Sequence, residues 1–143
     1  MEAARALADL TEISSQIQAA VLADRDGRVL GSTLGEEGRA ERLAQAALAL
    51  VAAAERVEGD SGQPLAQLEA ATSEGSVFVV RDAARLIAAT TSPEPTVGLV
   101  FYDLKSCLRA AAAEGEEAKP RPKARRASPE ESPPDDADAE GDA

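Results

Sequence analysis

The first third of the chain changes from a helical to a strand-like pattern of apolar residues. Between Leu7 and Ile17 the large apolar residues recur at every third or fourth position, which predicts an amphipathic helix over residues 3–15. From Ile17 onward they are consecutive, and two such runs flank the tetrapeptide Asp24-Arg25-Asp26-Gly27. An Asp-Gly pair between two apolar runs is the strongest short-range signal of a β-hairpin. We therefore expect strands at residues 17–24 and 28–33.

A long helix and three short strands are predicted in the middle of the chain. Glu36 and Glu37 follow a turn, and their negative charges suit the positive end of a helix that begins there. The helix is expected over residues 37–57, about six turns, and to end near Gly59. The segments after it are short and are separated by turn residues, as in a meander of antiparallel strands. They are Leu65–Thr72, Ser76–Arg81 and Leu86–Thr91.

A third amphipathic helix is predicted just after Pro93 and Pro95. Its apolar residues recur at intervals that place them on one side of a helix. They are Val97, Val100, Phe101, Leu104, Leu108 and Ala111. The predicted order of elements is therefore α-β-β-α-β-β-β-α.

The composition changes sharply near Glu114. Residues 114–143 hold five of the eight prolines and, apart from alanine, no apolar residue. Without apolar side chains the entropy lost on ordering is not offset, so we predict one domain over residues 1–113 and a disordered tail over 114–143. The charges of this tail are segregated into a basic block (Lys119, Arg121, Lys123, Arg125 and Arg126) and an acidic block (Glu130, Glu131, Asp135, Asp136, Asp138, Glu140 and Asp142).

The predicted sheet is apolar on both of its faces. Residues 19–23 and 77–80 are apolar at consecutive positions, so their side chains point to both sides of the sheet. A sheet with one face in water would alternate apolar and polar residues instead. Helices should therefore cover both faces, which predicts a three-layer α/β/α sandwich.

The middle helix has more apolar surface than one sheet can cover. Between residues 43 and 54 only Gln45 is polar, and a helix that is apolar all round is normally buried all round. A second copy of the same helix, related by a two-fold axis, would cover the remaining side. The alternative is that alanine is simply a good helix former and marks no interface. The residues expected at a homodimer interface are Leu43, Leu50 and Val57, with Ala46, Ala47, Ala53 and Ala54 allowing close approach.

Composition narrows the functional classes. The 143 residues carry a formal net charge of −11 and no histidine, which disfavours nucleic-acid binding and removes the commonest general base and zinc ligand. A single cysteine, Cys107, fits a reducing compartment. The N-terminus has no apolar core of a signal peptide, and the apolar run 46–54 is too short to span a bilayer. We therefore expect a cytoplasmic protein without a membrane span.

No set of residues predicts catalysis, a cofactor or a metal. The tetrapeptide at residues 24–27 faintly resembles a calcium loop, but Leu22 stands where such a loop needs its first ligand and Thr33 where it needs a bidentate glutamate, so a hairpin turn is favoured. Cys107 lies on the apolar side of the last helix, where a small buried residue is favoured over a nucleophile. An arginine offered to a partner's phosphates is the one catalytic contribution to consider. The candidates are Arg25, Arg28, Arg39, Arg42, Arg81 and Arg85, and the sequence favours none of them over a solvated charge.

Taken together, residues 5–112 resemble the Roadblock/dynein light-chain family, including its bacterial members. The resemblance lies in the order of elements and in particular segments. These are the helix Leu7–Ile13, the hairpin Ala20–Ser32, the long Ala/Leu helix, the strand Gly75–Val80, and Gly98-Leu99-Val100 at the start of the last helix. The alanine-rich middle helix and the charged tail depart from the family pattern.

The resemblance implies a five-stranded antiparallel sheet with the middle helix on one face and the terminal helices on the other. Similar proteins dimerise through the middle helix and the following edge strand, here Leu65–Thr72, which would add Leu68 to the interface. Family members bind or regulate Ras-like small GTPases, and some bacterial relatives stimulate GTP hydrolysis. The function expected here is a non-catalytic homodimeric regulator or adaptor of such a GTPase. The alternatives are a structural scaffold subunit, then a small-molecule sensor, and last an enzyme.

Ser128 is a candidate phosphorylation site in the tail. The sequence Arg125-Arg126-Ala127-Ser128-Pro129 resembles the target of a basophilic kinase. A phosphate at Ser128 would cancel much of the charge of the basic block. A solvated, unmodified tail is the alternative.

Overall fold

The computed structural model describes residues 2–36, 38–58 and 66–118. Within them the helices and strands follow the predicted order. They are α1 (Ala3–Ile13), β1 (Ile17–Asp24), β2 (Val29–Ser32), α2 (Arg39–Glu58), β3 (Gln67–Thr72), β4 (Gly75–Arg81), β5 (Arg85–Thr91) and α3 (Val97–Ala118).

The predicted domain boundary at residue 113 falls inside a helix. α3 continues to Ala118, because alanines and glutamates are good helix formers even where large apolar residues have ended. α3 therefore extends five residues past residue 113, and the domain boundary itself stays a prediction. Leu65 and residues 119–143, with the basic block, the acidic block and Ser128, lie outside the described residues.

The strands form one antiparallel sheet in the order β2-β1-β5-β4-β3. β1 pairs with β5, so Val21 lies opposite Ala88, and β5 pairs with β4, so Ala89 lies opposite Phe78. The three inner strands β1, β5 and β4 are the ones with consecutive buried residues. β2 and β3 are the edge strands, and each has a more polar or more exposed pattern.

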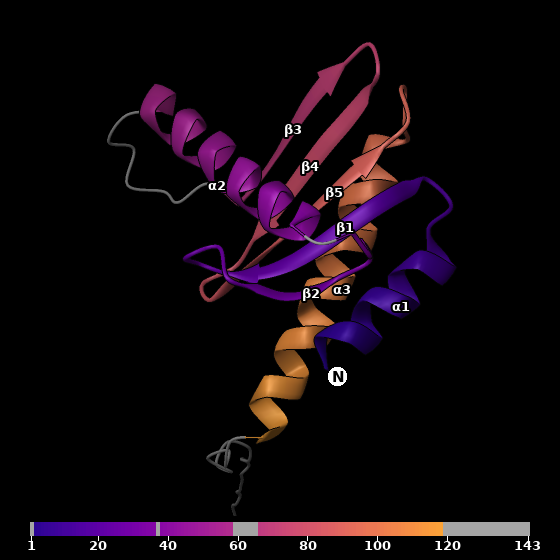
Figure 1. Ribbon diagram of the computed structural model, residues 1–143, viewed down its shortest axis with the longest axis vertical. Coiled ribbons are helices and arrows are strands. Elements are labelled where there is room, and N and C mark those ends of the chain that lie inside the picture. The colour runs from indigo at the N-terminus through magenta and orange to yellow at the C-terminus, as the bar shows by residue number, and fades with distance from the viewer. Residues whose placement is uncertain (1, 37, 59–65, 119–143) are drawn as a thin grey trace, which may run out of the picture.

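Helices cover both faces of the sheet, which confirms the predicted three layers (Figure 1). α2 packs on β1, β2 and β5 on one face, whereas α1 and α3 pack on each other and on the opposite face. On the α1–α3 side the ring of Phe78 meets that of Phe101 edge to face, with centroids 5.0 Å apart. On the α2 side Val79 and Leu86 are buried against the small residues of the helix. Alanines here let α2 approach the sheet closely.

The turn between β1 and β2 confirms the predicted hairpin. Gly27 has φ +94°, a conformation that favours glycine. The Asp24 carboxylate accepts hydrogen bonds from the backbone N–H groups of Asp26 and Arg28, each at 2.9 Å. The N–H of Arg28 in particular lowers the pKa of Asp24. The carboxylate of Asp24 therefore stabilises this turn.

None of the described helices combines the length and apolar character needed to cross a lipid bilayer.

Candidate functional site

One flank of α2 is apolar, and the described residues of the protomer leave much of it exposed. Ala46 and Ala53 are exposed, and Val57 is 87% exposed. Leu50 and Leu43 are partly buried at the same flank. Residues three, four and seven positions apart share a side of a helix, so these residues form one stripe along α2, together with Ala54. We call this stripe, residues 43, 46, 50, 53, 54 and 57, the α2 flank.

Ala47, predicted at the dimer interface, lies elsewhere. Its side chain is fully buried within the protomer, where it packs on the sheet with Ala44 and Val51. It therefore has no surface left to offer a second subunit. In an almost wholly apolar helix the sequence does not separate the side that faces the sheet from the side that faces outward.

The sheet next to the α2 flank is open. α2 lies over β1, β2 and β5, and the same face of β3 and β4 is only partly covered. The register pairs Leu68 with Val79 and Ala70 with Val77, and Val79 belongs to the core beneath α2. Leu68, Ala70 and Val77 are partly buried and point to that side.

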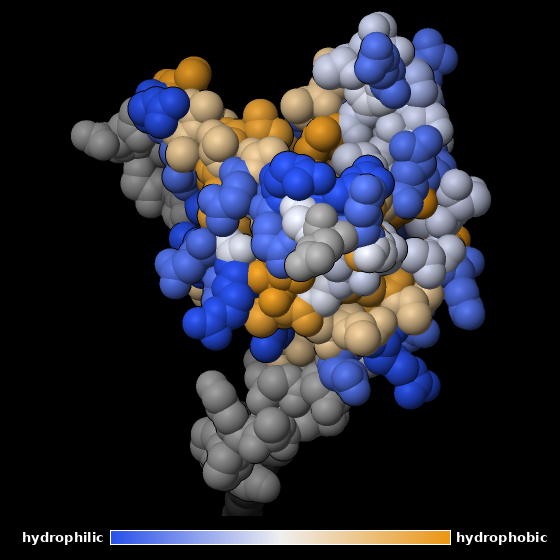
Figure 2. Space-filling view, in the orientation of Figure 1, coloured by the Kyte–Doolittle hydropathy of each residue, from blue (hydrophilic) through white to orange (hydrophobic). Residues whose placement is uncertain are grey.

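The α2 flank and the open part of β3 and β4 together form a notch. Figure 2 shows it at the upper rim of the molecule, as a hollow between the C-terminal end of α2 and the β3–β4 hairpin, with hydrophobic residues along its sides. We call it the α2–β3 notch. Leu43 on α2 and Leu68 on β3 both pack against the buried cluster beneath α2. Beyond it, none of the described strands pairs with the outer edge of β3.

An ion pair joins α2 to the sheet. Arg81 on β4 donates to the carboxylate of Glu55, and the Arg81 side chain is only 9% exposed. Arg25 donates to the carbonyl oxygen of Ala83 at 2.9 Å, which links the two hairpin turns at that end of the sheet. These two arginines, both candidates for contact with a partner's phosphates, are thus bound to their own chain.

Two other candidate arginines lie beside the α2 flank. Arg39 and Arg42 are exposed on the first turn of α2, and Arg39 makes a surface ion pair with Glu36 at 3.4 Å. With Leu43 and Thr90 they line a hollow of about 260 Å³. Of the six candidate arginines, Arg39 and Arg42 are therefore the pair that lies next to the candidate interface.

Cys107 lies in the core between α1 and α3. Its side chain is 5% exposed, and burial followed by the nearby charge of Asp9 raises the pKa of the thiol to about 11. A thiol with this pKa is almost wholly protonated at neutral pH and is a poor nucleophile. The predicted role as a small buried residue fits this position.

Comparison with known proteins identifies the architecture. The family model described as the Roadblock/LC7 domain matches residues 4–92. A search of curated protein sequences gives no match to the chain.

Solved structures with the same fold include bacterial proteins. A Roadblock/LC7 domain from Streptomyces avermitilis is 15% identical, with TM-score 0.72, over 81% of this chain and 99% of that one. The gliding protein MglB from Thermus thermophilus is 19% identical, with TM-score 0.67, over 80% and 89%. An MglB structure described as having a tetrameric arrangement is 21% identical, with TM-score 0.66, over 80% and 90%. At these identities the likeness concerns the fold.

Proposed function

Because the chain belongs to the Roadblock/LC7 domain family, we propose that it acts as a cytoplasmic homodimer that binds a Ras-like small GTPase and modulates its GTP hydrolysis without being an enzyme itself. The observation that carries this proposal is the α2–β3 notch. A contiguous apolar surface of this kind on a small domain is a site of protein association.

A second copy of the chain is the occupant that suits the notch. Around a two-fold axis the α2 flank of each subunit would lie in the notch of the other, with Leu50 near the centre and small alanines allowing close approach. Leu68 and Ala70 would extend the apolar contact onto the sheet. The free edge of β3 would pair with its counterpart and remove two unpaired strand edges at once.

The GTPase contact is proposed at the joined α2 helices. Dimerisation would bring two copies of Arg39 and Arg42 to one surface, at the N-terminal ends of both α2 helices. Exposed guanidinium groups bind phosphates and carboxylates with two parallel hydrogen bonds. The chain has no Gly-x4-Gly-Lys-Ser/Thr motif, so the nucleotide would stay on the partner, and this protein would act by positioning the partner's own loops.

The test is capture of the GTPase by the full chain from its own cell. The purified protein serves as bait in lysate supplied either with GDP or with a non-hydrolysable GTP analogue, and captured proteins are identified by mass spectrometry. We expect one protein with a P-loop GTPase sequence, enriched under one nucleotide. The control bait carries Arg39→Glu and Arg42→Glu, which should lose that protein and remain dimeric. Absence of any such GTPase under both nucleotides would refute the proposal.

The second candidate is a structural scaffold subunit without a GTPase contact. It is favoured by the tetrameric arrangement described for one MglB structure of the same fold. Light scattering separates the two candidates. Growth beyond a dimer at micromolar concentration favours the scaffold, whereas a constant dimer favours the regulator.

A further inference from the structure

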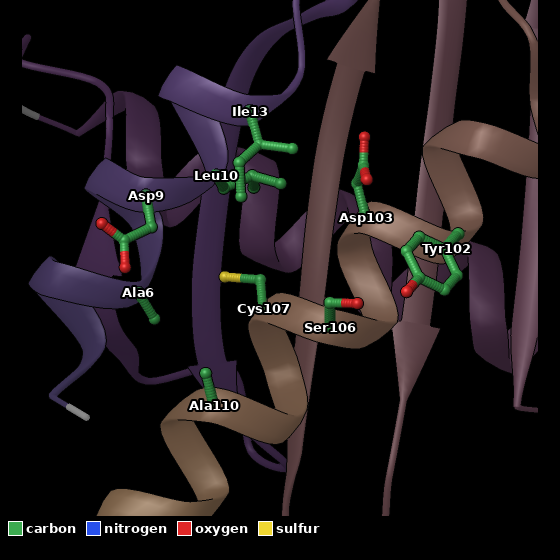
Figure 3. Close-up of a pocket in the computed structure, with 9 residues that line it drawn as sticks. All are labelled: Ala6, Asp9, Leu10, Ile13, Tyr102, Asp103, Ser106, Cys107 and Ala110. Carbon is green, nitrogen blue, oxygen red and sulfur yellow. The ribbon is translucent and has the colours of Figure 1, made fainter.

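A second, separate groove lies on the other face of the sheet. α1 and α3 run side by side there, and between them is a groove of about 290 Å³ (Figure 3). We call it the α1–α3 groove. α1 contributes Ala6, Asp9, Leu10 and Ile13, and α3 contributes Tyr102, Asp103, Ser106, Cys107 and Ala110.

Asp103 is the feature that points to a ligand. It is 7% exposed and lines the groove, and among the described residues its carboxylate has neither a hydrogen bond nor an ion pair. Among the described residues Ser14 Oγ is the one fully buried side-chain polar atom without a partner, so the oxygens of Asp103 keep contact with water in the groove. Acids that are mostly buried are usually paired, and a cation that enters the groove from outside would supply the partner that the described residues do not.

The rest of the groove favours a cationic ligand with an apolar backbone or stem. Asp9 is the second acid in its wall, and the described residues that line it include neither lysine nor arginine. Two large side chains at its rim are unusually exposed for their type, Ile13 at 71% and Tyr102 at 63%. An aromatic ring beside carboxylates suits proline rings and the methylene stems and charged heads of lysine and arginine.

The basic block of the chain has this chemistry. Residues 119–126 read Lys-Pro-Arg-Pro-Lys-Ala-Arg-Arg, which gives five cations and two prolines in eight residues. Proline-rich segments bind aromatic-lined grooves as extended polyproline helices, with little entropy to lose.

The basic block also begins close enough to the α1–α3 groove to reach Asp103. It follows Ala118, the end of the helix that forms one wall of the groove. Asp103 lies about 22 Å back along that helix at about 1.5 Å per residue. An extended segment of about 3.1 Å per residue spans about 25 Å over residues 119–126. A turn after Ala118 would therefore bring Arg125 and Arg126 to the level of Asp103.

We propose that the α1–α3 groove binds the chain's own residues 119–126, with an arginine of the block paired to Asp103. A tethered segment has an effective concentration of about a millimolar, so it competes well against a separate molecule. A phosphate on Ser128, two residues after Arg126, would weaken the pairing and release the segment. This proposal does not depend on the proposed GTPase function, because the groove and the α2–β3 notch lie on opposite faces of the sheet.

Tyr102 provides a direct probe of the groove. It is the single tyrosine of a chain that has no tryptophan, so the ultraviolet fluorescence of the full-length protein reports on this one rim residue. We would compare quenching by acrylamide, a neutral quencher, in the unaltered chain and in a variant with all five cations of the basic block changed to glutamine. The docked segment should shield the ring, so the variant should be quenched about twofold more efficiently.

Two further variants separate docking from a general charge effect. In the control chain Glu130, Glu131, Asp135, Asp136 and Asp138 are changed to Gln or Asn, and its quenching should not exceed that of the unaltered chain. Asp103→Asn should raise quenching as much as neutralising the basic block, and combining the two should add nothing. Ser128→Asp should lie between the extremes.

Three results would contradict the proposed docking of the basic block. Equal quenching in the unaltered and basic-block variants would overturn the proposal, as would a rise only in the acidic-block control. Additive effects of Asp103→Asn and the basic-block change would show that the two do not meet. The tail substitutions lie outside both cores, and circular dichroism checks that every variant is folded.

Discussion

Changing Leu50 to glutamate should convert the protein to a monomer while the protomer stays folded. Leu50 lies on the α2 flank and is only partly buried within one subunit. A glutamate at this position therefore has space for its side chain and stays in contact with water in the separated protomer. Circular dichroism should therefore be unchanged. In the proposed dimer the same position would be near the two-fold axis and out of water.

The size of the effect follows from this position. Loss of the remaining apolar contact of Leu50 costs about 1 kcal/mol per copy. Withdrawal of an unpaired carboxylate from water costs several kcal/mol more, and the other residues of the α2 flank are apolar and give it no partner. Two copies meet in one interface, so dimerisation should weaken by at least ~5 kcal/mol, or more than about a thousandfold in Kd.

The assay is sedimentation velocity over a dilution series, with Leu30→Glu as the matched control. Leu30 is 42% exposed on β2, at the opposite edge of the sheet from the α2–β3 notch. The control should sediment like the unaltered protein. A dimer of undiminished affinity in Leu50→Glu, or equal dissociation in both variants, would refute the reasoning.

Three further predictions concern the protomer. Gly75→Ala should lower the free energy of unfolding by about 3 kcal/mol or more in urea titrations, because φ is +150° and a Cβ would collide with the Thr91 carbonyl oxygen; an unchanged midpoint would contradict this. Cys107, with its pKa raised by burial to about 11, should react with a neutral disulfide at pH about 7.5 at least about a hundredfold more slowly than in the urea-unfolded chain; equal rates would show an accessible thiolate. The pKa of Asp24 is lowered mainly by the N–H of Arg28. Its contribution to stability is therefore present above its usual value near 3.8 and is lost as the pH falls through the lower folded value. The difference in urea midpoint between the unaltered chain and Asp24→Ala should shrink on acidification, and a constant difference would contradict the assignment.

Much of the fold was predictable, because short runs of neighbouring residues carry the signals for its turns, strands and helices. The Asp-Gly pair at residues 26–27 determined the first hairpin, and the consecutive apolar residues 77–80 predicted that helices cover both faces. The pairing of β1 with β5 was implied by the family resemblance alone, because local periodicity carries no information on which distant strands pair.

The sites were less predictable, for different reasons. Ala47 could not be assigned to the sheet side of α2, because almost every neighbour in the sequence is apolar. The α1–α3 groove depends on how closely two helices approach, which their sequences do not specify. One signal was available, since Asp103 lies between Val100 and Cys107 at helical spacing, and thus has a charge on the buried side of α3.

In the proposed dimer, two copies of the chain bury the α2 flank in each other's α2–β3 notch. Sedimentation equilibrium of the full-length, unaltered protein tests it most directly. A dimer has a mass of about 29 kDa, twice the 14.7 kDa of one chain, and we expect this mass at micromolar concentration. A mass of 14.7 kDa that persists to high concentration would contradict it.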